Sequence, residues 1–308
     1  MSHRWDQTIN ITPEIATTLL SSQFNVTVDE ISVLGEGFDN IAFLVNHSLV
    51  FRFPRRELGV MCIENEMMLL PHLAGKLSFP FSHPTFIGTP TDLYPFPFAG
   101  YPLLSGVPLS QAASHPISEI SFAKQLGQWL NELHALPVLK KHAGMIKGDQ
   151  TWRLNLKQRK EVLLNNIEQY EKIYVDADFS PEILINTFHH FHEKQFIHDK
   201  ECYLHGDLYA KHVLVDKAGS LNGLIDWGDT HIGHPAIDLS VGIMIFSDNA
   251  LAHFFNSYGN IDDNMIQTAV FRAFCHGFAA LPYFTLIQDV NGSAWTRAAL
   301  QRALQMGK

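Results

Sequence analysis

The sequence has few charged residues and no excess of positive charge. Asp, Glu, Lys and Arg make up 17% of the 308 residues, and 22 basic residues face 31 acidic ones, which gives a formal net charge of −9. Nucleic-acid-binding proteins normally carry a basic face, so the sequence predicts no nucleic-acid partner. The negative balance is typical of a soluble protein, or of one that receives a cationic small molecule.

Cysteines and long apolar runs are also scarce. The three cysteines, Cys62, Cys202 and Cys275, form no CxxC pair and no zinc-binding spacing, which is typical of a protein from a reducing compartment. The chain lacks the long uncharged apolar run that spans a membrane, and its amino terminus lacks the apolar segment of a secretory signal. We therefore expect a cytoplasmic protein with no membrane partner. The oligomeric state stays open, with a monomer expected.

The apolar content is high enough for a sizeable core. Hydrophobic residues make up 46% of the chain, which excludes an intrinsically disordered protein. The length allows two domains. Because strand-forming patterns dominate the first third and helical patterns the rest, we place a boundary near residue 105. This division predicts a domain of residues 1–104 and a domain of residues 105–308.

Strand and helix patterns alternate in the first domain. Residues 31–34, 41–45 and 49–53 are rich in β-formers and are separated by short turns, which predicts an antiparallel meander of three strands. From residue 57 to residue 73 the pattern becomes helical, and we expect Pro71 and the glycine at position 75 to end that helix.

The second domain reads as helices around one small β-hairpin. Apolar residues at three- and four-residue spacing over 120–133 predict a buried amphipathic helix. A charged helical pair is expected at 149–172 and 181–194. Between helices, residues 213–215 and 221–225 flank a short polar turn, and this pattern predicts a β-hairpin.

The first chemical motif is Gly35-Glu36-Gly37, which we expect to form the turn after the first strand. Glycines at such a place let the backbone approach a phosphate without a Cβ in the way, although a plain hairpin turn explains them equally well. The motif is not a dinucleotide-binding fingerprint, because Asn40 stands at the third glycine position and a strand follows. A GK[ST] loop is absent from the sequence.

The second motif pairs Arg52 with Glu66. Arg52 is a lone cation in a strand of apolar residues, and Glu66 follows fourteen residues later on the predicted helix 57–73. A strand cation held by a helix carboxylate presents a fixed positive charge to nucleotide phosphates. The alternative is a surface arginine and a solvated acid.

The most informative segment is 203–212, followed by Asp226. It places Asp207 on a tight turn and His212 five residues later, and the hairpin should bring both to the same end of one sheet as Asp226. Two carboxylates and a third ligand suit a magnesium-assisted phosphoryl transfer, although histidine is an uneasy ligand for Mg²⁺. Two alternatives stay open, namely acids that cap turns and a metal hydrolase that uses His205 with the two aspartates.

Together these residues resemble the aminoglycoside phosphotransferase family, the small-molecule branch of the protein-kinase-like fold, which also holds macrolide and choline kinases. The similarity runs over roughly two-thirds of the chain, from about Leu34 to Leu239. The segments that carry it are His205-Gly-Asp207 with His212, Ile225-Asp-Trp-Gly-Asp229, the loop from Gly35 to Asn40, the strand Phe51–Pro54, Leu133-His134, and the stretch Gly233–Leu239 with Asp238, whose acid is structural in the family.

The resemblance implies an α+β, two-lobed, protein-kinase-like fold with a β-rich N-lobe and a helical C-lobe that contains the hairpin. It assigns Asp207 as the catalytic base and Asp226 as the main magnesium ligand. His212 takes the second metal position, where Asn is usual, a departure shared by the macrolide and 2″-aminoglycoside branches. Arg52 takes the place of the phosphate-binding lysine, with Glu66 as its helix partner.

The nucleotide site is completed by the glycine loop and the connector between the lobes. Gly35 and Gly37 would lie against the phosphates, and the carbonyl of Pro102 and the N–H of Leu104 would read the purine edge. The resemblance implies a phosphotransferase that moves the γ-phosphoryl of Mg-ATP or Mg-GTP to a hydroxyl of a small molecule, such as an aminoglycoside-like antibiotic or a related metabolite. The alternative is a nucleotide-binding pseudokinase that senses a metabolite without turnover.

Overall fold

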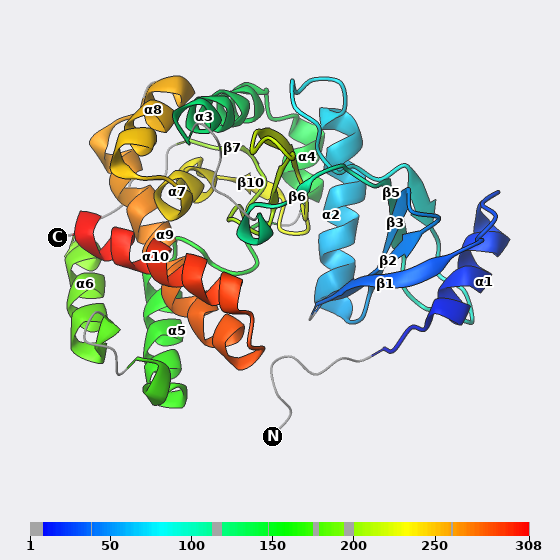
Figure 1. Ribbon diagram of the computed structural model, residues 1–308, viewed down its shortest axis with the longest axis horizontal. Coiled ribbons are helices and arrows are strands. Elements are labelled where there is room, and N and C mark those ends of the chain that lie inside the picture. The colour runs from blue at the N-terminus through cyan, green and yellow to red at the C-terminus, as the bar shows by residue number, and fades with distance from the viewer. Residues whose placement is uncertain are drawn as a thin grey trace. The chain divides into compact units, whose positions relative to one another are not determined.

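The protein is described by a computed structural model (Figure 1), which covers residues 9–37, 39–112, 119–146, 148–174, 179–193, 200–259 and 261–307. Residue 38 of the glycine loop and residue 194 of the expected second helix of the pair lie outside these ranges. The chain is α+β and forms two compact units. The first unit comprises Met1–Ser105, Leu139–Lys147 and Leu224–Thr230, and the second comprises Gly106–Val138, Gly148–Gly223 and His231–Lys308.

The first unit is built on a five-stranded antiparallel sheet. Its strands, in their order across the sheet, are β1 (Ile31–Glu36), β2 (Asn40–Val45), β3 (Leu49–Pro54), β5 (Phe98–Pro102) and β4 (Phe86–Gly88). The predicted meander of three strands is confirmed as β1–β3. Buried residues alternate with half-buried ones along β2, the pattern of a strand with one face on the core.

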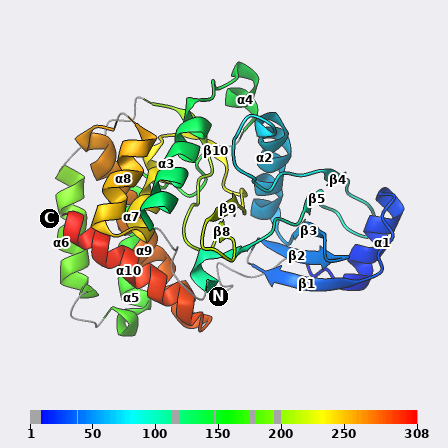
Figure 2. The ribbon, with the colours of Figure 1, turned by 45° about the horizontal axis from the view of Figure 1, so that its top comes forward.

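Helix α1 (Pro13–Gln23) covers one face of this sheet (Figure 2). The helix begins at Thr12, whose side chain accepts a hydrogen bond from the N–H of Ile15, as an N-cap residue should. Leu19 and Leu20 of the helix pack in one apolar cluster with the aromatic rings of β3 and β5, including Phe53 and Phe98 stacked at 4.5 Å between ring centroids. This cluster fixes the sheet that carries Arg52.

Helix α2 runs from Glu57 to Leu73, as predicted, but Pro71 lies inside it. The prediction that Pro71 ends the helix is therefore wrong. A proline this close to the C-terminus removes one hydrogen bond of the last turn, and the buried Leu70 and Leu73 hold that turn in place. The helix ends before Gly75, whose φ of +75° continues the chain in the left-handed region that glycine adopts readily. Helix α4 (Lys140–Met145) also belongs to the first unit.

The glycine motif lies differently from the prediction. Gly35 and Glu36 are part of strand β1, and the strand pairing shifts register between Val33 and Gly35. The turn follows them and is closed by a 2.9 Å hydrogen bond from the N–H of Gly37 to the carbonyl of Asn40. Gly35 thus lies at a β-bulge, where one strand carries an extra residue opposite its partner, and Gly37 lies at the turn.

The second unit is mainly helical. Its helices are α3 (Glu119–Ala135), α5 (Leu156–Gln169), α6 (Pro181–Glu193), α7 (Ala236–Ile245), α8 (Asp248–Tyr258), α9 (Asp263–Leu286) and α10 (Val290–Met306), with 3₁₀ turns at Leu109–Gln111 and Glu171–Ile173. The helix predicted at 120–133 is confirmed as α3. The helix predicted at 149–172 begins later, because Asn155 caps α5 by accepting from the N–H of Gln158.

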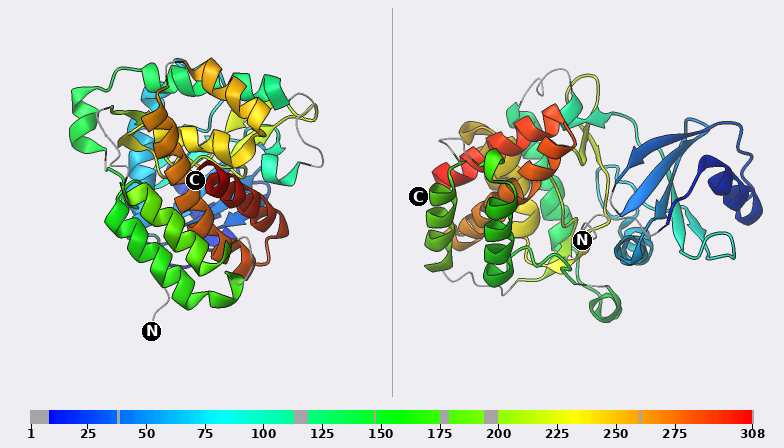
Figure 3. Two further views of the ribbon diagram at one scale, coloured as in Figure 1. Left: turned by 90° about the vertical axis from the view of Figure 1, so that its left-hand side faces the viewer. Right: turned by 90° about the horizontal axis from the view of Figure 1, so that it is seen from below.

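Helix α7 is the centre of this unit. Every residue from Ala236 to Ile245 is buried, and α9, α10 and α8 pack against it. Helices α5 and α6 lie side by side (Figure 3), and α5 also contacts α9. Among the helices of the described residues, none is long and apolar enough to cross a membrane.

Two small sheets interrupt the helices. Strands β6 (Val107–Pro108), β8 (Val213–Val215) and β9 (Leu221–Leu224) form one sheet, and β7 (Cys202–Leu204) pairs with β10 (His231–Gly233) in another. The predicted hairpin is confirmed as β8 and β9. The expectation that one sheet presents Asp207, His212 and Asp226 at the same end is wrong, because Asp207 follows β7 and the hairpin belongs to the other sheet.

Candidate active site

Arg52 is held between two carboxylates in the first unit. Its Nη1 lies 2.6 Å from Oε1 of Glu66, and its Nη2 lies 2.9 Å from Oδ1 of Asp226. Burial alone would lower the pKa of the Arg52 guanidinium, but the two carboxylates outweigh it and raise that pKa. The structure therefore brings together three residues that the sequence separates by up to 174 positions.

Glu66 is the buried member of this group. Its side chain on α2 is 1% exposed, and its Oε2 accepts a 2.6 Å hydrogen bond from the hydroxyl of Tyr101 on β5. Burial raises the pKa of Glu66, and the Arg52 charge and the Tyr101 hydroxyl oppose that rise. A buried carboxylate with two such donors holds Arg52 in one orientation. Sequence reasoning did not find Tyr101, because nothing in the sequence indicates which strand lies over Glu66.

Asp226 is the accessible member. Its segment joins the first unit through backbone hydrogen bonds between Leu224 and Pro80 and between Ser82 and Leu224, and Trp227 packs on Phe81. Asp226 has a φ of +60°, which aspartate tolerates better than most residues. Its side chain remains 47% exposed although it contacts Arg52. A strained, half-exposed carboxylate beside a fixed cation is a pattern found at functional sites.

The glycine loop is tied to the end of β3 by two arginines that sequence reasoning missed. The Nη1 of Arg55 lies 2.6 Å from Oε1 of Glu36, and the Nε of Arg56 lies 2.5 Å from Oδ1 of Asp39. A Cβ built on Gly35 would meet nothing within 4 Å. The fold itself therefore does not require a glycine at this position, so its role as a phosphate-facing residue stays a prediction.

The two expected purine-reading residues lie at the end of β5. Pro102 is the last residue of the strand and pairs with Leu49, and the N–H of Leu103 donates a 2.8 Å hydrogen bond to the carbonyl of Ser48. Leu104 follows as a half-buried residue. The structure contains no nucleotide, and the assignment of these two backbone groups to the purine remains a prediction.

In the second unit, Asp238 fixes the turn that carries Asp207. The fully buried Asp238 on α7 accepts 2.8 Å hydrogen bonds from the N–H groups of His205 and Gly206, and the Nε2 of His134 lies 3.2 Å away. Burial opposes ionisation, but His134 and these amides keep the pKa of Asp238 below its usual value. Gly206 has a φ of +90°, which explains the glycine in this turn.

Asp207 and His212 lie next to each other beyond that turn. The Nδ1 of His212 is 2.7 Å from the backbone carbonyl of Asp207 and 3.9 Å from its Oδ2. Because a carbonyl can only accept, Nδ1 carries the proton, and Nε2 is the nitrogen with a lone pair. Oδ1 of Asp207 contacts Nη2 of Arg272 on α9 at 3.1 Å. Arg272 is a functional candidate that the sequence did not suggest, since it stands 65 residues away in an apolar helix.

The donor set fits a magnesium ion only in part. Asp226 offers the oxygen atoms that Mg²⁺ prefers, and this ion commonly uses one or two carboxylates together with substrate phosphates. His212 offers a nitrogen and fits Mg²⁺ poorly. Within the described residues no three His, Cys, Asp or Glu side chains gather as a metal-holding group. The ligand set of the metal-hydrolase alternative is therefore absent from that part of the chain.

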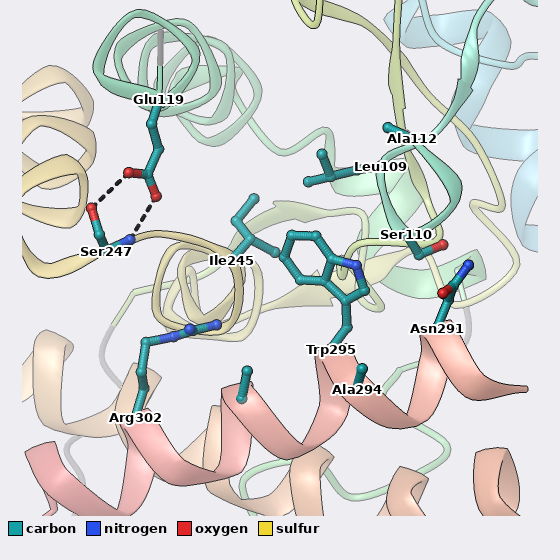
Figure 4. A pocket seen from close by; sticks show the side chains of 11 residues that line it. Leu109, Ser110, Ala112, Glu119, Ile245, Ser247, Asn291, Ala294, Trp295 and Arg302 are labelled. Carbon is teal, nitrogen blue, oxygen red and sulfur yellow. Dashed lines mark hydrogen bonds between the residues drawn. The ribbon is translucent and has the colours of Figure 1, made fainter. Parts of the chain in front are cut away.

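A pocket of about 530 Å³ opens in the second unit (Figure 4). The indole of Trp295 on α10 projects into it from one side. Its two charged lining residues are engaged by the protein itself, since Glu119 accepts from the N–H and Oγ of Ser247, and Arg302 donates to the carbonyl of Ile243. The pocket borders the segment that follows Asp207, because the N–H of its lining residue Ser110 donates to the carbonyl of Ala210. Asp207 is not among its lining residues.

Known proteins resemble this chain in sequence and in fold. The sequence profile of the phosphotransferase enzyme family (APH) matches residues 30–274. The GDP complex of wild-type aminoglycoside 2'-phosphotransferase-IIIa is 25% identical with a TM-score of 0.72, and the match covers 95% of this chain and 98% of that chain. Macrolide 2'-phosphotransferase type I is 20% identical with a TM-score of 0.63, over 94% of this chain and 98% of that one.

A curated relative, the uncharacterized protein YcbJ of Bacillus subtilis (strain 168), is 34% identical over 55 residues, which span 18% of each chain. The structural likenesses confirm the α+β, protein-kinase-like fold that the sequence predicted. Because the family profile spans most of the sequence, from the first strand to the middle of α9, the chain belongs to the phosphotransferase enzyme family (APH).

Proposed function

We propose that this chain transfers the γ-phosphoryl group of Mg-ATP or Mg-GTP to a hydroxyl group of a small molecule. The observation that carries the proposal is the contact of Arg52 with both the buried Glu66 and the accessible Asp226. A fixed cation next to an accessible carboxylate suits a metal-bound phosphate chain. Family membership supports it, and a cytoplasmic location, where both nucleotides are available, is part of the proposal.

The first unit supplies the nucleotide side of the reaction. Arg52 binds phosphate oxygens and is kept in place by Glu66, and Asp226 holds the magnesium ion. When bound, the ion neutralises charge that develops on the transferred group. Gly35 and Gly37 leave room for the phosphates, and the backbone of Pro102 and Leu104 binds the purine. His212 can serve as a second ligand only through Nε2, because its Nδ1–H is used by the Asp207 carbonyl.

The second unit supplies the acceptor side. Asp207 accepts the proton of the acceptor hydroxyl as the hydroxyl oxygen bonds to the γ-phosphorus, while the bond from that phosphorus to the β–γ bridging oxygen breaks and the nucleoside diphosphate leaves. Arg272 holds the Asp207 carboxylate through Oδ1. Asp238 positions the turn through the N–H groups of His205 and Gly206. Catalysis in this scheme comes from positioning and charge stabilisation, with a proton acceptor worth about 10²–10⁴ in rate.

A nucleotide-binding pseudokinase is the second candidate. One observation favours it, namely that the Nη2 of Arg52 lies 2.9 Å from Oδ1 of Asp226. An arginine bound there competes with a magnesium ion for the same oxygen atom. Under this alternative the chain binds nucleotide and senses a metabolite, but transfers nothing.

The test is nucleoside diphosphate release from Mg-ATP and Mg-GTP with a panel of hydroxyl acceptors, comparing wild type with Asp207→Asn. The panel holds aminoglycosides, macrolides, amino alcohols, sugar acids and sugar phosphates. We expect acceptor-dependent release that falls by about 10²–10⁴-fold in Asp207→Asn, with nucleotide affinity unchanged. Asp248→Asn, which changes an exposed aspartate of α8 in the same unit, is the matched control and should keep full turnover.

Undiminished turnover in Asp207→Asn would exclude Asp207 as the base. Nucleotide binding without release for any acceptor would favour the pseudokinase. Failure to bind either nucleotide would contradict both candidates.

A further inference from the structure

Three arginines gather around the acceptor side of the proposed site. Arg153 precedes α5, Arg159 lies in the first turns of α5, and Arg272 lies in the middle of α9, which packs against α5. Arg153 and Arg272 are only 4% and 5% exposed, and Arg159 is half-buried. We call these three residues the arginine cluster. Buried arginines are rare unless each charge is balanced.

The described hydrogen bonds of the arginine cluster pair two of its members with carboxylates and the third with an uncharged group. Arg272 contacts Asp207 at 3.1 Å, and Nη1 of Arg153 contacts Oδ1 of Asp149 at 2.6 Å. Arg159 donates from Nη2 to the backbone carbonyl of Thr151, which carries no net charge. Of the three guanidinium groups, that of Arg159 is thus the one whose described hydrogen bond goes to an uncharged acceptor.

The cluster also has hydrogen-bond donors without acceptors. Within the described residues, the buried Nε atoms of Arg159 and Arg272 have no hydrogen-bond partner. A buried donor left unpaired costs the desolvation of that group, and the cost is larger when the group is charged. An anionic group supplied from outside the protein would relieve that cost at both donors.

The electrostatics of the surroundings agree with a positive site. Burial lowers the pKa of Arg272, and the nearby Arg153 lowers it further, while Asp207 opposes the change.

We infer that the arginine cluster binds an oxyanion, a carboxylate or a phosphate, carried by the acceptor molecule whose hydroxyl faces Asp207. The inference rests on the proposed function, whose acceptor class it narrows. Arginine suits this task because its planar fork matches the oxygen geometry of carboxylate and phosphate groups. The acceptor is then a hydroxy acid or a phosphorylated alcohol, whereas the overall negative charge of the chain had favoured a cationic one.

The first experiment measures binding by calorimetry, with gluconate and glycerol 3-phosphate as anionic probes and glucose and glycerol as their neutral counterparts. Wild type, Arg159→Gln, Arg272→Gln and the control Arg297→Gln are compared. Arg297 lies on α10 over the ring of Phe179, outside the cluster. Saturating Mg-nucleotide is included to block phosphate binding at Arg52.

We expect an anionic probe to bind at least about tenfold more tightly than its neutral counterpart. That affinity should fall about tenfold or more in Arg159→Gln and Arg272→Gln, which corresponds to the loss of one charge-assisted hydrogen bond. Arg297→Gln should bind like wild type. Arg159 is half-buried and donates a hydrogen bond to a backbone carbonyl, so its variant keeps the test valid if Arg272→Gln does not fold.

The outcomes separate this inference from the proposed function. Equal binding of anionic and neutral probes, or anion binding that Arg159→Gln leaves unchanged, overturns the inference. Turnover of cationic acceptors at the same rate in wild type and Arg159→Gln also overturns it, and leaves the phosphotransferase function intact. Anion binding that is lost in Arg159→Gln, in a protein that binds no nucleotide, supports the anion site and contradicts the proposed function.

Discussion

In the first unit one arginine, Arg52, contacts two carboxylates, whereas in the second unit Arg153 and Arg272 contact one carboxylate each. Both groups use the same side-chain chemistry, but their described contacts differ. In the Arg52 group two carboxylates share one arginine, an arrangement that suits a bound divalent cation. In the arginine cluster the buried Nε atoms of Arg159 and Arg272 lack acceptors within the described residues, an arrangement that suits a bound anion. The contacts within each group thus indicate the kind of ligand that would complete it.

The two groups also differ in which member is exposed. In the first, the carboxylate of Asp226 is accessible while the cation and Glu66 are buried. In the second, Arg153 and Arg272 are buried, and Asp207 is partly accessible. An exposed charge is stabilised by water, whereas a buried one depends on its partners. The loss of unfolding free energy caused by a substitution in either group should therefore depend more on how deeply the affected charge is buried than on the sign of that charge.

The largest expected effect on stability comes from Arg52→Gln. This substitution leaves the carboxylate of Glu66, which is 1% exposed, without its cation. Breaking a buried pair in this way costs about 3–5 kcal/mol of unfolding free energy, measured by urea denaturation. Arg56→Gln removes a more exposed pair with Asp39 and should cost about 1 kcal/mol or less. Equal losses of unfolding free energy in Arg52→Gln and Arg56→Gln would show that burial does not determine the strength of these two ion pairs.

The second effect is a pH dependence that arises from Asp149. Burial opposes its ionisation, but the Arg153 charge and hydrogen bonds lower the pKa of Asp149 to about 2. Because the folded pKa is below the unfolded one, Asp149 stabilises the fold above about pH 4, and this contribution is lost as the pH falls toward 2. It amounts to about 2 kcal/mol at pH 7.

Urea titrations of wild type and Asp149→Asn should therefore differ by about that amount at pH 7 and converge between about pH 4 and pH 2. Asp149→Asn also removes the carboxylate that Arg153 contacts, so this variant should bind sulfate at the arginine cluster more tightly than wild type does. A stability difference that stays constant down to pH 2 would contradict the ion pair with Arg153.

The smallest expected effect on stability comes from a change at Tyr101, the uncharged residue that donates to Glu66. Tyr101→Phe removes the hydroxyl that donates to Oε2 of Glu66 and leaves the ring in place. A buried acceptor that loses one donor costs about 1–2 kcal/mol. Tyr170→Phe, at a partly exposed position of the second unit, should change stability by no more than about 0.5 kcal/mol. If both variants unfold at the same urea concentration, the Tyr101 hydroxyl does not hold Glu66.

Local patterns in the sequence were sufficient to predict most secondary-structure elements. Thr12 and Pro13 specify the start of α1, apolar spacing specifies α3, and the alternating β-formers specify the meander. These features depend on neighbours within one or two turns of chain, which is why they can be read from sequence. The predictions failed at Pro71, where the buried Leu70 and Leu73 hold the last turn of α2, and at Gly35, which pairs with Ala42 as part of β1.

The site was predictable in part for the same reason. The resemblance pointed to five residues, Arg52, Glu66, Asp207, His212 and Asp226. In the first unit Arg52 contacts Glu66 and Asp226, and in the second unit His212 contacts Asp207. It pointed also to Asp238, which fixes the turn before Asp207. Their roles in phosphoryl transfer remain proposals that the substitutions above test.

The sequence by itself determined the elements, the family and the order of the motifs, because these depend on local spacing. Only the tertiary structure decided what surrounds each charge. Arg272 meets Asp207 across 65 residues, and Tyr101 meets Glu66 across 35. Such contacts arise when α9 packs against α5 and β5 lies near α2. The strength of a charge interaction depends on burial and distance, and both of these are properties of the folded chain.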